Sequence, residues 1–150
     1  MLARLPTGCP SIDELLGGGV EAGALTLVYG EPGSGKTSLA LQLSREVLAS
    51  GGKSVLFIDT EGLSAERLEQ VCGGEAPDGL SIAVPVDQAE LLELLKGRDN
   101  PPALLIIDTV NAYARLEYAI DKEKCERVFT RMMIGLYNLA TRHDLPILLT

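Results

Sequence analysis

The stretch of sequence that decides the fold reads Gly30-Glu31-Pro32-Gly33-Ser34-Gly35-Lys36-Thr37. It fits the pattern G-x-x-x-x-G-K-[ST], in which glycines let consecutive backbone N–H groups turn inward around phosphate oxygens. An aliphatic run over residues 24–29 precedes the stretch, and a helical pattern over residues 36–49 follows it. The sequence therefore predicts a phosphate-binding loop between a strand and a helix. The alternative is a glycine-rich turn that holds a lysine by chance.

All the residues of this loop are expected to bind nucleotide phosphates. The N-terminus of the following helix carries a partial positive charge and would face the same anion. Lys36 would bring its charge to the β- and γ-phosphates, and the Thr37 hydroxyl would bind Mg²⁺. The loop thus predicts a nucleotide site with a magnesium ion.

Short apolar runs alternate with helical patterns along the rest of the chain. Further strands are expected over residues 54–59, 80–84, 103–108 and 145–149. Helices are expected from Ser64 to Cys72, from Asp87 to near Gly97, and over residues 122–143, with loops over residues 17–19, 73–79 and 97–102. Ser64 and Asp87 are the expected N-caps. Apolar strands that alternate with helices predict an α/β fold with a mostly parallel sheet and helices on both faces.

The helical pattern over residues 122–143 has an apolar stripe at the spacing of one helix face. The stripe consists of Cys125, Val128, Phe129, Met132, Met133, Leu136 and Ala140. We expect the two methionines on it to fill the core. Gly135 inside this helix costs about 1 kcal/mol relative to alanine, and either close packing or chance explains it.

Two strands end near carboxylates that would face the loop. An aliphatic strand ends at Asp108, where an acid can hold Mg²⁺ from the side opposite the Thr37 hydroxyl. Asp59 and Glu61 follow the second strand, at the edge where parallel sheets place their sites. Hydrolysis of the γ-phosphate needs a group that orients the attacking water. Glu61 is the candidate for that task and Asp59 its competitor; a solvated loop acid is the remaining alternative.

Charge and composition exclude several classes of protein. The 150 residues carry a formal net charge of −8, so a surface that is basic all over is excluded and any nucleic-acid contact must be local. Residues 115–142 nevertheless hold six basic and four acidic side chains. Arg127 and Arg131 share a helix face there; the pattern favours a solvated helix face, with a patch that contacts phosphates as the alternative. The content of 46% hydrophobic and 4% aromatic residues predicts one globular domain with an aliphatic core.

The same features bear on location. Three cysteines that lie far apart, beside a single histidine, argue against a zinc site and a disulfide framework and favour a reducing cytosol. Residues 1–8 lack a secretory signal, and no apolar run approaches the roughly 18 residues of a membrane span. We therefore expect a cytoplasmic protein without a membrane partner.

The residues around the loop narrow the field further. Three more stretches are informative: Thr7-Gly8-Cys9-Pro10-Ser11-Ile12-Asp13-Glu14-Leu15-Leu16-Gly17-Gly18-Gly19, Asp59-Thr60-Glu61-Gly62, and Asp108-Thr109-Val110-Asn111-Ala112-Tyr113-Ala114-Arg115. With the loop, they resemble the ATPase core of RecA-like recombinases, and the first of them is shared with the KaiC family. The second, followed by Ser64-Ala65-Glu66-Arg67-Leu68, is similar to the recombinase branch rather than to KaiC. The resemblance covers essentially the whole chain and is greatest to the short archaeal RadB branch, related to the RadA recombinase.

This resemblance implies a RecA-type P-loop NTPase with ATP and Mg²⁺ as cofactors. Lys36 and Thr37 would bind them, and Asp108 would be the acidic partner of the metal. Glu61 would be the catalytic carboxylate, with Lys36 beside it in catalysis. The first DNA-facing loop of the family would begin after Tyr113.

Arg115 is therefore a candidate contact for a DNA phosphate. An ion pair with Glu117 or another neighbouring acid is the alternative. With Arg127 and Arg131, it completes the set of expected DNA contacts.

The resemblance also implies that parts of a recombinase are missing. Recombinases carry a further domain and a polymerisation motif ahead of the core, whereas 29 residues precede Gly30 here. After Thr150 the family continues with a polar sensor and a second DNA-facing loop. We therefore expect residues 1–150 to form one RecA-like core without its C-terminal part. In this fold class the strand over residues 145–149 would lie between those over residues 24–29 and 103–108.

Three functions are compatible with these residues. The first is a weak, DNA-linked ATPase in homologous recombination and DNA repair. The second is a mediator that binds ATP without hydrolysing it and assists a RadA-type recombinase. The third is a KaiC-like regulatory ATPase. Single-stranded DNA, a recombinase and a second copy of the chain are the expected partners.

Overall fold

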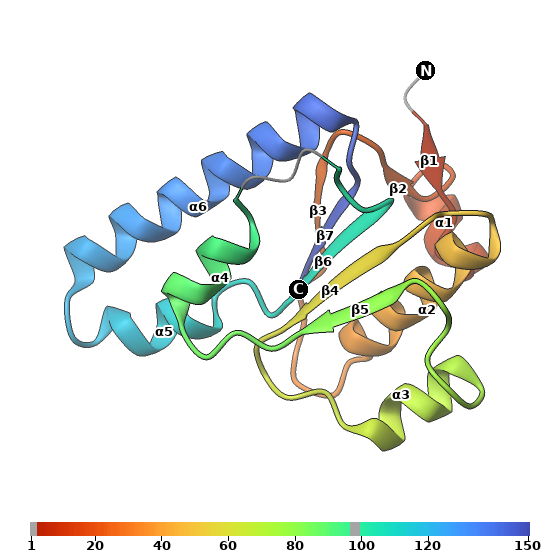
Figure 1. Cartoon of the computed structure of the whole chain (residues 1–150), viewed down its shortest axis with the longest axis horizontal. Coiled ribbons are helices and arrows are strands. Elements are labelled where there is room, and N and C mark those ends of the chain that lie inside the picture. The colour runs from red at the N-terminus through yellow and green to blue at the C-terminus, as the bar shows by residue number, and fades with distance from the viewer. Residues whose placement is uncertain (1–2, 97–99) are drawn as a thin grey trace.

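A parallel sheet forms the centre of the molecule in the computed structural model, which describes residues 3–96 and 100–150 (Figure 1). Within these residues its five strands are β3 (Leu25–Leu27), β4 (Val55–Asp59), β5 (Leu80–Ala83), β6 (Leu104–Asp108) and β7 (Ile147–Leu149). Their order across the sheet is β3-β7-β6-β4-β5, and each neighbouring pair is parallel. The predicted fold class is confirmed, as is the position of β7 between β3 and β6.

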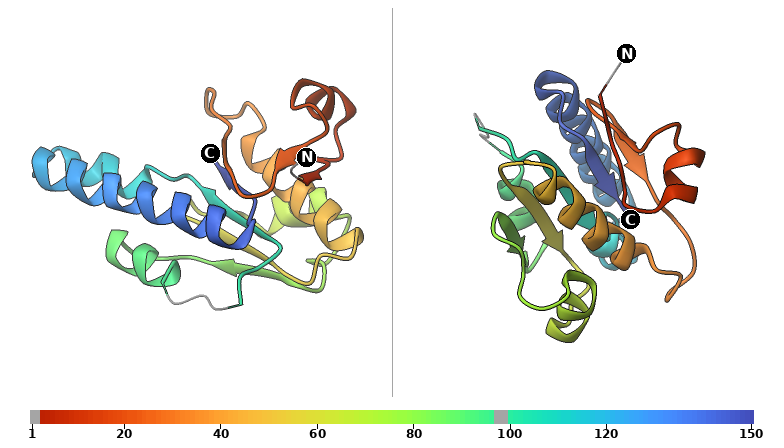
Figure 2. Two further views of the ribbon diagram at one scale, coloured as in Figure 1. Left: turned by 90° about the horizontal axis from the view of Figure 1, so that it is seen from above. Right: turned by 90° about the vertical axis from the view of Figure 1, so that its right-hand side faces the viewer.

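Helices cover both faces of the sheet, as Figure 2 shows. The longer ones are α2 (Lys36–Ala49), α3 (Ala65–Cys72), α4 (Gln88–Leu94) and α6 (Lys122–His143). The sheet has a hydrophobic core on each face, and alternate residues of β4 belong to different cores. Val55 and Phe57 belong to the core under α2. Leu56 and Ile58 belong to the core under α4 and α6. All five residues of β4 are buried, because a parallel strand covered on both faces has no solvent side.

The core is aliphatic, as predicted. Phe57 is the single aromatic side chain among the buried hydrophobic residues of the described part of the chain. On α6, Met132 is buried and Met133 packs against the same cluster, so both fill the core. Gly135 is exposed, and a Cβ built on it meets nothing within 4 Å. Close packing therefore does not explain this glycine.

The stretch ahead of the loop forms structure that the periodicity did not predict. A two-stranded hairpin joins β1 (Arg4–Leu5) to β2 (Val20–Glu21), and α1 (Pro10–Leu15) lies between them. The Asp13 carboxylate accepts hydrogen bonds of 2.7 Å from both the backbone N–H and the hydroxyl of Thr7. Gly19 has a φ of +121°, and a Cβ there would lie 2.1 Å from a backbone oxygen of β1. Only glycine fits where the backbone passes this close to β1.

Several element boundaries differ from the predictions. The strand expected over residues 24–29 is limited to β3, because the chain turns into the loop at Tyr29, which is 86% exposed. Pro85 and Pro146 lie just outside β5 and β7, at the places where the expected strands are shortened. Proline lacks the N–H that a ladder needs.

The expected helices mostly agree with the structure, while one further helix was not expected. α2 and α6 have the predicted bounds, and the Ser64 and Asp87 side chains cap α3 and α4 as predicted. The helix α5 (Ala112–Tyr118) was not predicted. The expected end of α4 near Gly97 and the start of the following loop lie outside the described residues. Among the helices of residues 3–96 and 100–150, none is long and apolar enough to cross a bilayer.

Candidate nucleotide site

The phosphate-binding loop lies between β3 and α2, as its mechanism requires. Gly33 and Gly35 have φ values of +79° and +94°, a left-handed conformation that other residues rarely adopt. These glycines turn the backbone sharply before α2 begins at Lys36. Within the described residues no side chain caps the start of α2, so its first N–H groups can donate to an anion.

Lys36 lies back on its own loop. Its Nζ donates hydrogen bonds of 3.0 Å to the carbonyl oxygens of Gly30 and of Glu31. These contacts hold the ammonium group against the loop. A phosphate oxygen there would compete for the same donor with a full negative charge, so the lysine is placed for the predicted role.

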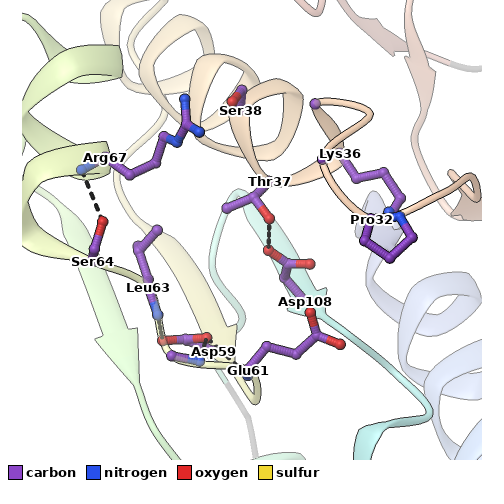
Figure 3. Close-up of a pocket in the computed structure, with 13 residues that line it drawn as sticks. Pro32, Lys36, Thr37, Ser38, Asp59, Glu61, Leu63, Ser64, Arg67 and Asp108 are labelled. Atoms are coloured by element: carbon purple, nitrogen blue, oxygen red, sulfur yellow. Dashed lines mark hydrogen bonds between the residues drawn. The ribbon is translucent and has the colours of Figure 1, made fainter.

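Thr37 and Asp108 meet across the sheet edge. The Thr37 hydroxyl donates to Asp108 Oδ2 at 2.6 Å, although 71 positions separate the two residues (Figure 3). The other carboxylate oxygen accepts from the Thr150 hydroxyl, and Thr150 Oγ1 lies 3.4 Å from the hydroxyl of Thr109. Asp108 is 5% exposed, and a buried carboxylate is costly without hydrogen bonds. Both of its oxygens accept one, from Thr37 and from Thr150.

This pair of oxygen groups suits a magnesium ion. Mg²⁺ prefers oxygen ligands and retains several waters, and in nucleotide sites it is held by one or two protein groups together with phosphates. Thr37 and Asp108 offer a hydroxyl and a carboxylate beside the loop. No cluster of three or more His, Cys, Asp or Glu side chains suited to a metal occurs in the described residues. The donor set therefore fits an ion that arrives with the nucleotide.

Asp59 and Glu61, the two competing acids after β4, have different environments. Asp59 is 4% exposed, and its Oδ1 accepts from the N–H of Glu61 at 3.1 Å and of Gly62 at 2.8 Å. Its Oδ2 accepts from the N–H of Leu63. Both oxygens of Asp59 thus hold the turn after β4. Glu61 extends from that turn beside Asp108 in Figure 3, with an exposed side chain.

Arg115, one of the expected DNA contacts, forms an ion pair with Glu61. Its guanidinium Nη2 donates to Glu61 Oε1 at 3.0 Å, and the two side chains are 62% and 54% exposed. The pairing partner is thus Glu61, and the alternative with Glu117 is not what the structure shows. Two residues that the sequence assigned to separate tasks are in contact.

One cavity of about 470 Å³ is lined by Lys36, Thr37, Asp59, Glu61 and Asp108. Its lining comes from the loop and the first turn of α2, from residues 59–67, and from Asp108. Arg67 and Ser64 were not among the predicted site residues. They belong to it because α3 packs beside α2, a contact that neither segment reveals alone; their proximity to Glu61 in the sequence was the available signal. Figure 3 shows Arg67 extending from α3 towards Ser38.

Arg127 and Arg131 lie away from this cavity, on the exposed side of α6. Arg127 Nη1 is 3.6 Å from a carboxylate oxygen of Glu123, one turn earlier on the same helix. Both arginines line a shallow groove of their own on α6. A DNA contact at these two residues stays a prediction.

Comparison with known proteins adds to the geometry. A sequence model described as Rad51 matches residues 1–150. The DNA repair and recombination protein RadB of Methanoculleus marisnigri is 39% identical to the chain, over 98% of the chain and 69% of the relative. The RadB proteins of Halobacterium salinarum and Archaeoglobus fulgidus are 36% and 35% identical, over 98% and 97% of the chain and 66% and 69% of the relatives. The chain thus spans about two thirds of the length of these relatives.

Proposed function

The chain belongs to the Rad51 family, and we propose that it binds Mg²⁺–ATP in this cavity and serves homologous recombination and DNA repair. The observation that carries the proposal is the convergence of the loop, the Thr37–Asp108 pair and Glu61 around one cavity. The similarity to archaeal RadB proteins supports the recombination role and favours it over the KaiC-like alternative.

Each group has a proposed task in ATP hydrolysis. The loop N–H groups and Lys36 bind the phosphates; Thr37 and Asp108 would hold a magnesium ion, which would supply positive charge beside the phosphates. Glu61 orients a water whose oxygen attacks the γ-phosphorus; a proton of that water passes to the carboxylate, and the bond to the β-phosphate oxygen breaks. Asp59 has both oxygens engaged by backbone N–H groups. This leaves Glu61 as the acid able to turn towards the water.

Replacing Glu61 with glutamine tests this assignment. The amide keeps the shape of the side chain but cannot accept the proton, and loss of one such group typically lowers turnover about 10²–10⁴-fold. We expect Glu61→Gln to lose ATP turnover, with and without single-stranded DNA, while it binds a fluorescent ATP analogue like the wild type. Glu69→Gln, an exposed charge on α3, is the matched control. Unchanged turnover in Glu61→Gln would refute the role of Glu61.

The same measurements separate the proposed ATPase from the non-hydrolysing mediator. A mediator would bind the ATP analogue, show no turnover with DNA, and bind a recombinase only with nucleotide present. The names of the relatives, which refer to DNA repair and recombination, support DNA as a proposed partner. A RadA-type recombinase stays a prediction. A homo-oligomer and a cytoplasmic location stay predictions.

A further inference from the structure

The contact between Glu61 and Arg115 links the candidate catalytic acid to helix α5. The two residues lie 54 positions apart, and their ion pair joins the turn after β4 to α5. The Glu61 backbone is already held, because its N–H donates to Asp59 Oδ1 at 3.1 Å. Arg115 therefore restrains the part of Glu61 that remains able to turn, its carboxylate.

Arg115 is placed so that a ligand outside the cavity can reach it. Its side chain is 62% exposed and also lines a second cavity of about 390 Å³ between α5 and α6, beside Tyr118 and Glu126. Lys122 lies next to this cavity, with its Nζ 5.5 Å from the centre of the Tyr118 ring and 3.9 Å from a carboxylate oxygen of Glu126. Two cations and an aromatic ring thus stand at one end of the molecule, a combination suited to a single-stranded nucleic acid.

We propose that Arg115 acts as a positioning residue that holds Glu61 back in the resting protein, and that single-stranded DNA releases Glu61 by taking the guanidinium onto a phosphate. The proposal rests on the proposed function, since it needs Glu61 to orient the attacking water. A carboxylate oxygen that accepts from a guanidinium is less able to accept from water. A phosphate can accept two hydrogen bonds from the guanidinium of Arg115, which donates one to Glu61, so the exchange leaves the guanidinium paired and the carboxylate able to turn.

The exposure of the pair determines how strong this control is. Both side chains are more than half exposed, and exposed ion pairs shift an equilibrium by roughly 1.4- to 5-fold. A contact of this strength restrains the acid and still yields to a polyanion. Arg115 thus slows hydrolysis modestly, an effect called the brake below. The brake acts on turnover and not on ATP binding, because the ion pair does not include the phosphate-binding loop.

The test is Arg115→Gln, measured in steady-state ATP turnover with and without an oligodeoxythymidylate. We expect turnover without DNA to rise about 1.4- to 5-fold, the KM for ATP to stay unchanged, and DNA to give no further stimulation. Arg115→Lys, which keeps the charge, should return the turnover towards that of the wild type. Lys96→Gln is the matched control, because it removes one positive charge from an ion pair of similar exposure, between Glu93 on α4 and Lys96 just after this helix.

Ionic strength provides a readout that a merely structural role would not change. Salt screens exposed ion pairs, with a Debye length of about 10 Å at 0.1 M and about 3 Å at 1 M. Added sodium chloride should therefore raise the DNA-independent turnover of the wild type and of Lys96→Gln relative to that of Arg115→Gln. Circular dichroism of each variant checks that the fold is kept.

The outcomes separate the two proposals. If Glu61→Gln loses turnover but Arg115→Gln turns over ATP no faster than the wild type, the brake is refuted and the role of Glu61 stands. DNA stimulation that persists in Arg115→Gln also refutes the brake. If Glu61→Gln hydrolyses ATP like the wild type, the proposed function and the brake fail together.

Discussion

Asp59 is the acid whose replacement tests the structural argument most directly. Its two carboxylate oxygens accept three backbone N–H groups from the turn after β4, and the side chain is buried. Asparagine has the same shape but offers one oxygen and one NH₂ group. If the amide oxygen keeps the N–H groups of Glu61 and Gly62, the NH₂ group faces the N–H of Leu63, donor against donor. The replacement therefore cannot satisfy the turn in either orientation.

The cost of Asp59→Asn follows from these bonds. One partly buried N–H loses its acceptor, which costs about 1–3 kcal/mol. The other two bonds lose the charge of their acceptor, which we take as about 0.5–1 kcal/mol each, since charge-assisted bonds are roughly twice as strong as neutral ones. We expect the free energy of unfolding to fall by about 2–5 kcal/mol. Turnover should fall as well, because the turn that carries Glu61 loses its anchor.

Urea denaturation followed by far-UV circular dichroism measures the loss; the chain has no tryptophan to report by fluorescence. Asp87→Asn is the matched control. Asp87 is exposed and accepts a single N–H, that of Glu90, at 2.8 Å, and asparagine caps helices as well as aspartate does. The control should lie within about 0.5 kcal/mol of the wild type. If Asp59→Asn costs less than about 1 kcal/mol, or no more than the control, the assignment of Asp59 as the anchor of the turn is refuted.

Three further replacements concern stability. Gly135→Ala should raise the free energy of unfolding by about 1 kcal/mol, because a Cβ at this position meets nothing within 4 Å. Gly52→Ala should lower the free energy of unfolding, since a Cβ there lies 2.7 Å from the Val47 oxygen. Calorimetry measures both changes, and a destabilised Gly135→Ala would contradict the argument. Tyr113→Phe should cost about 1 kcal/mol near neutral pH, since the hydroxyl donates to the Pro85 oxygen. Burial and, to a smaller extent, the charges of nearby acids raise the pKa of Tyr113 above its ordinary value of about 10. The folded protein therefore disfavours the ionised tyrosine. The stability that the Tyr113 hydroxyl contributes is lost as the pH rises through the raised pKa. Denaturation of both proteins at rising alkaline pH should show the difference narrowing, and a constant difference would contradict the assignment.

The local signals in the sequence predicted most of the fold. α2 and α6 begin and end where their caps and apolar periods indicate, and the aliphatic run of β6 is buried as expected. α5 was missed because its seven residues are too few to show a period. Among the described residues, no side chain, including that of the N-cap residue Asn111, forms a capping hydrogen bond at its start. The hairpin of β1 and β2 was missed for a similar reason. Each of its strands has two residues, and their pairing depends on a contact over some fifteen positions.

The sequence by itself determined which chemical groups the candidate site contains. The glycine spacing of the loop, Lys36, Thr37, and an acid at the end of an aliphatic strand predict a phosphate site with a metal, because backbone conformation and residue type are local properties. Tertiary structure alone decided which groups meet. In the folded chain, Asp59 accepts hydrogen bonds from the turn after β4, and the Thr150 hydroxyl donates to Asp108. Glu61 pairs with Arg115, 54 positions away. These contacts arise because neighbouring parallel strands end at one edge of the sheet, and strand order is set by packing between segments that are distant in the chain.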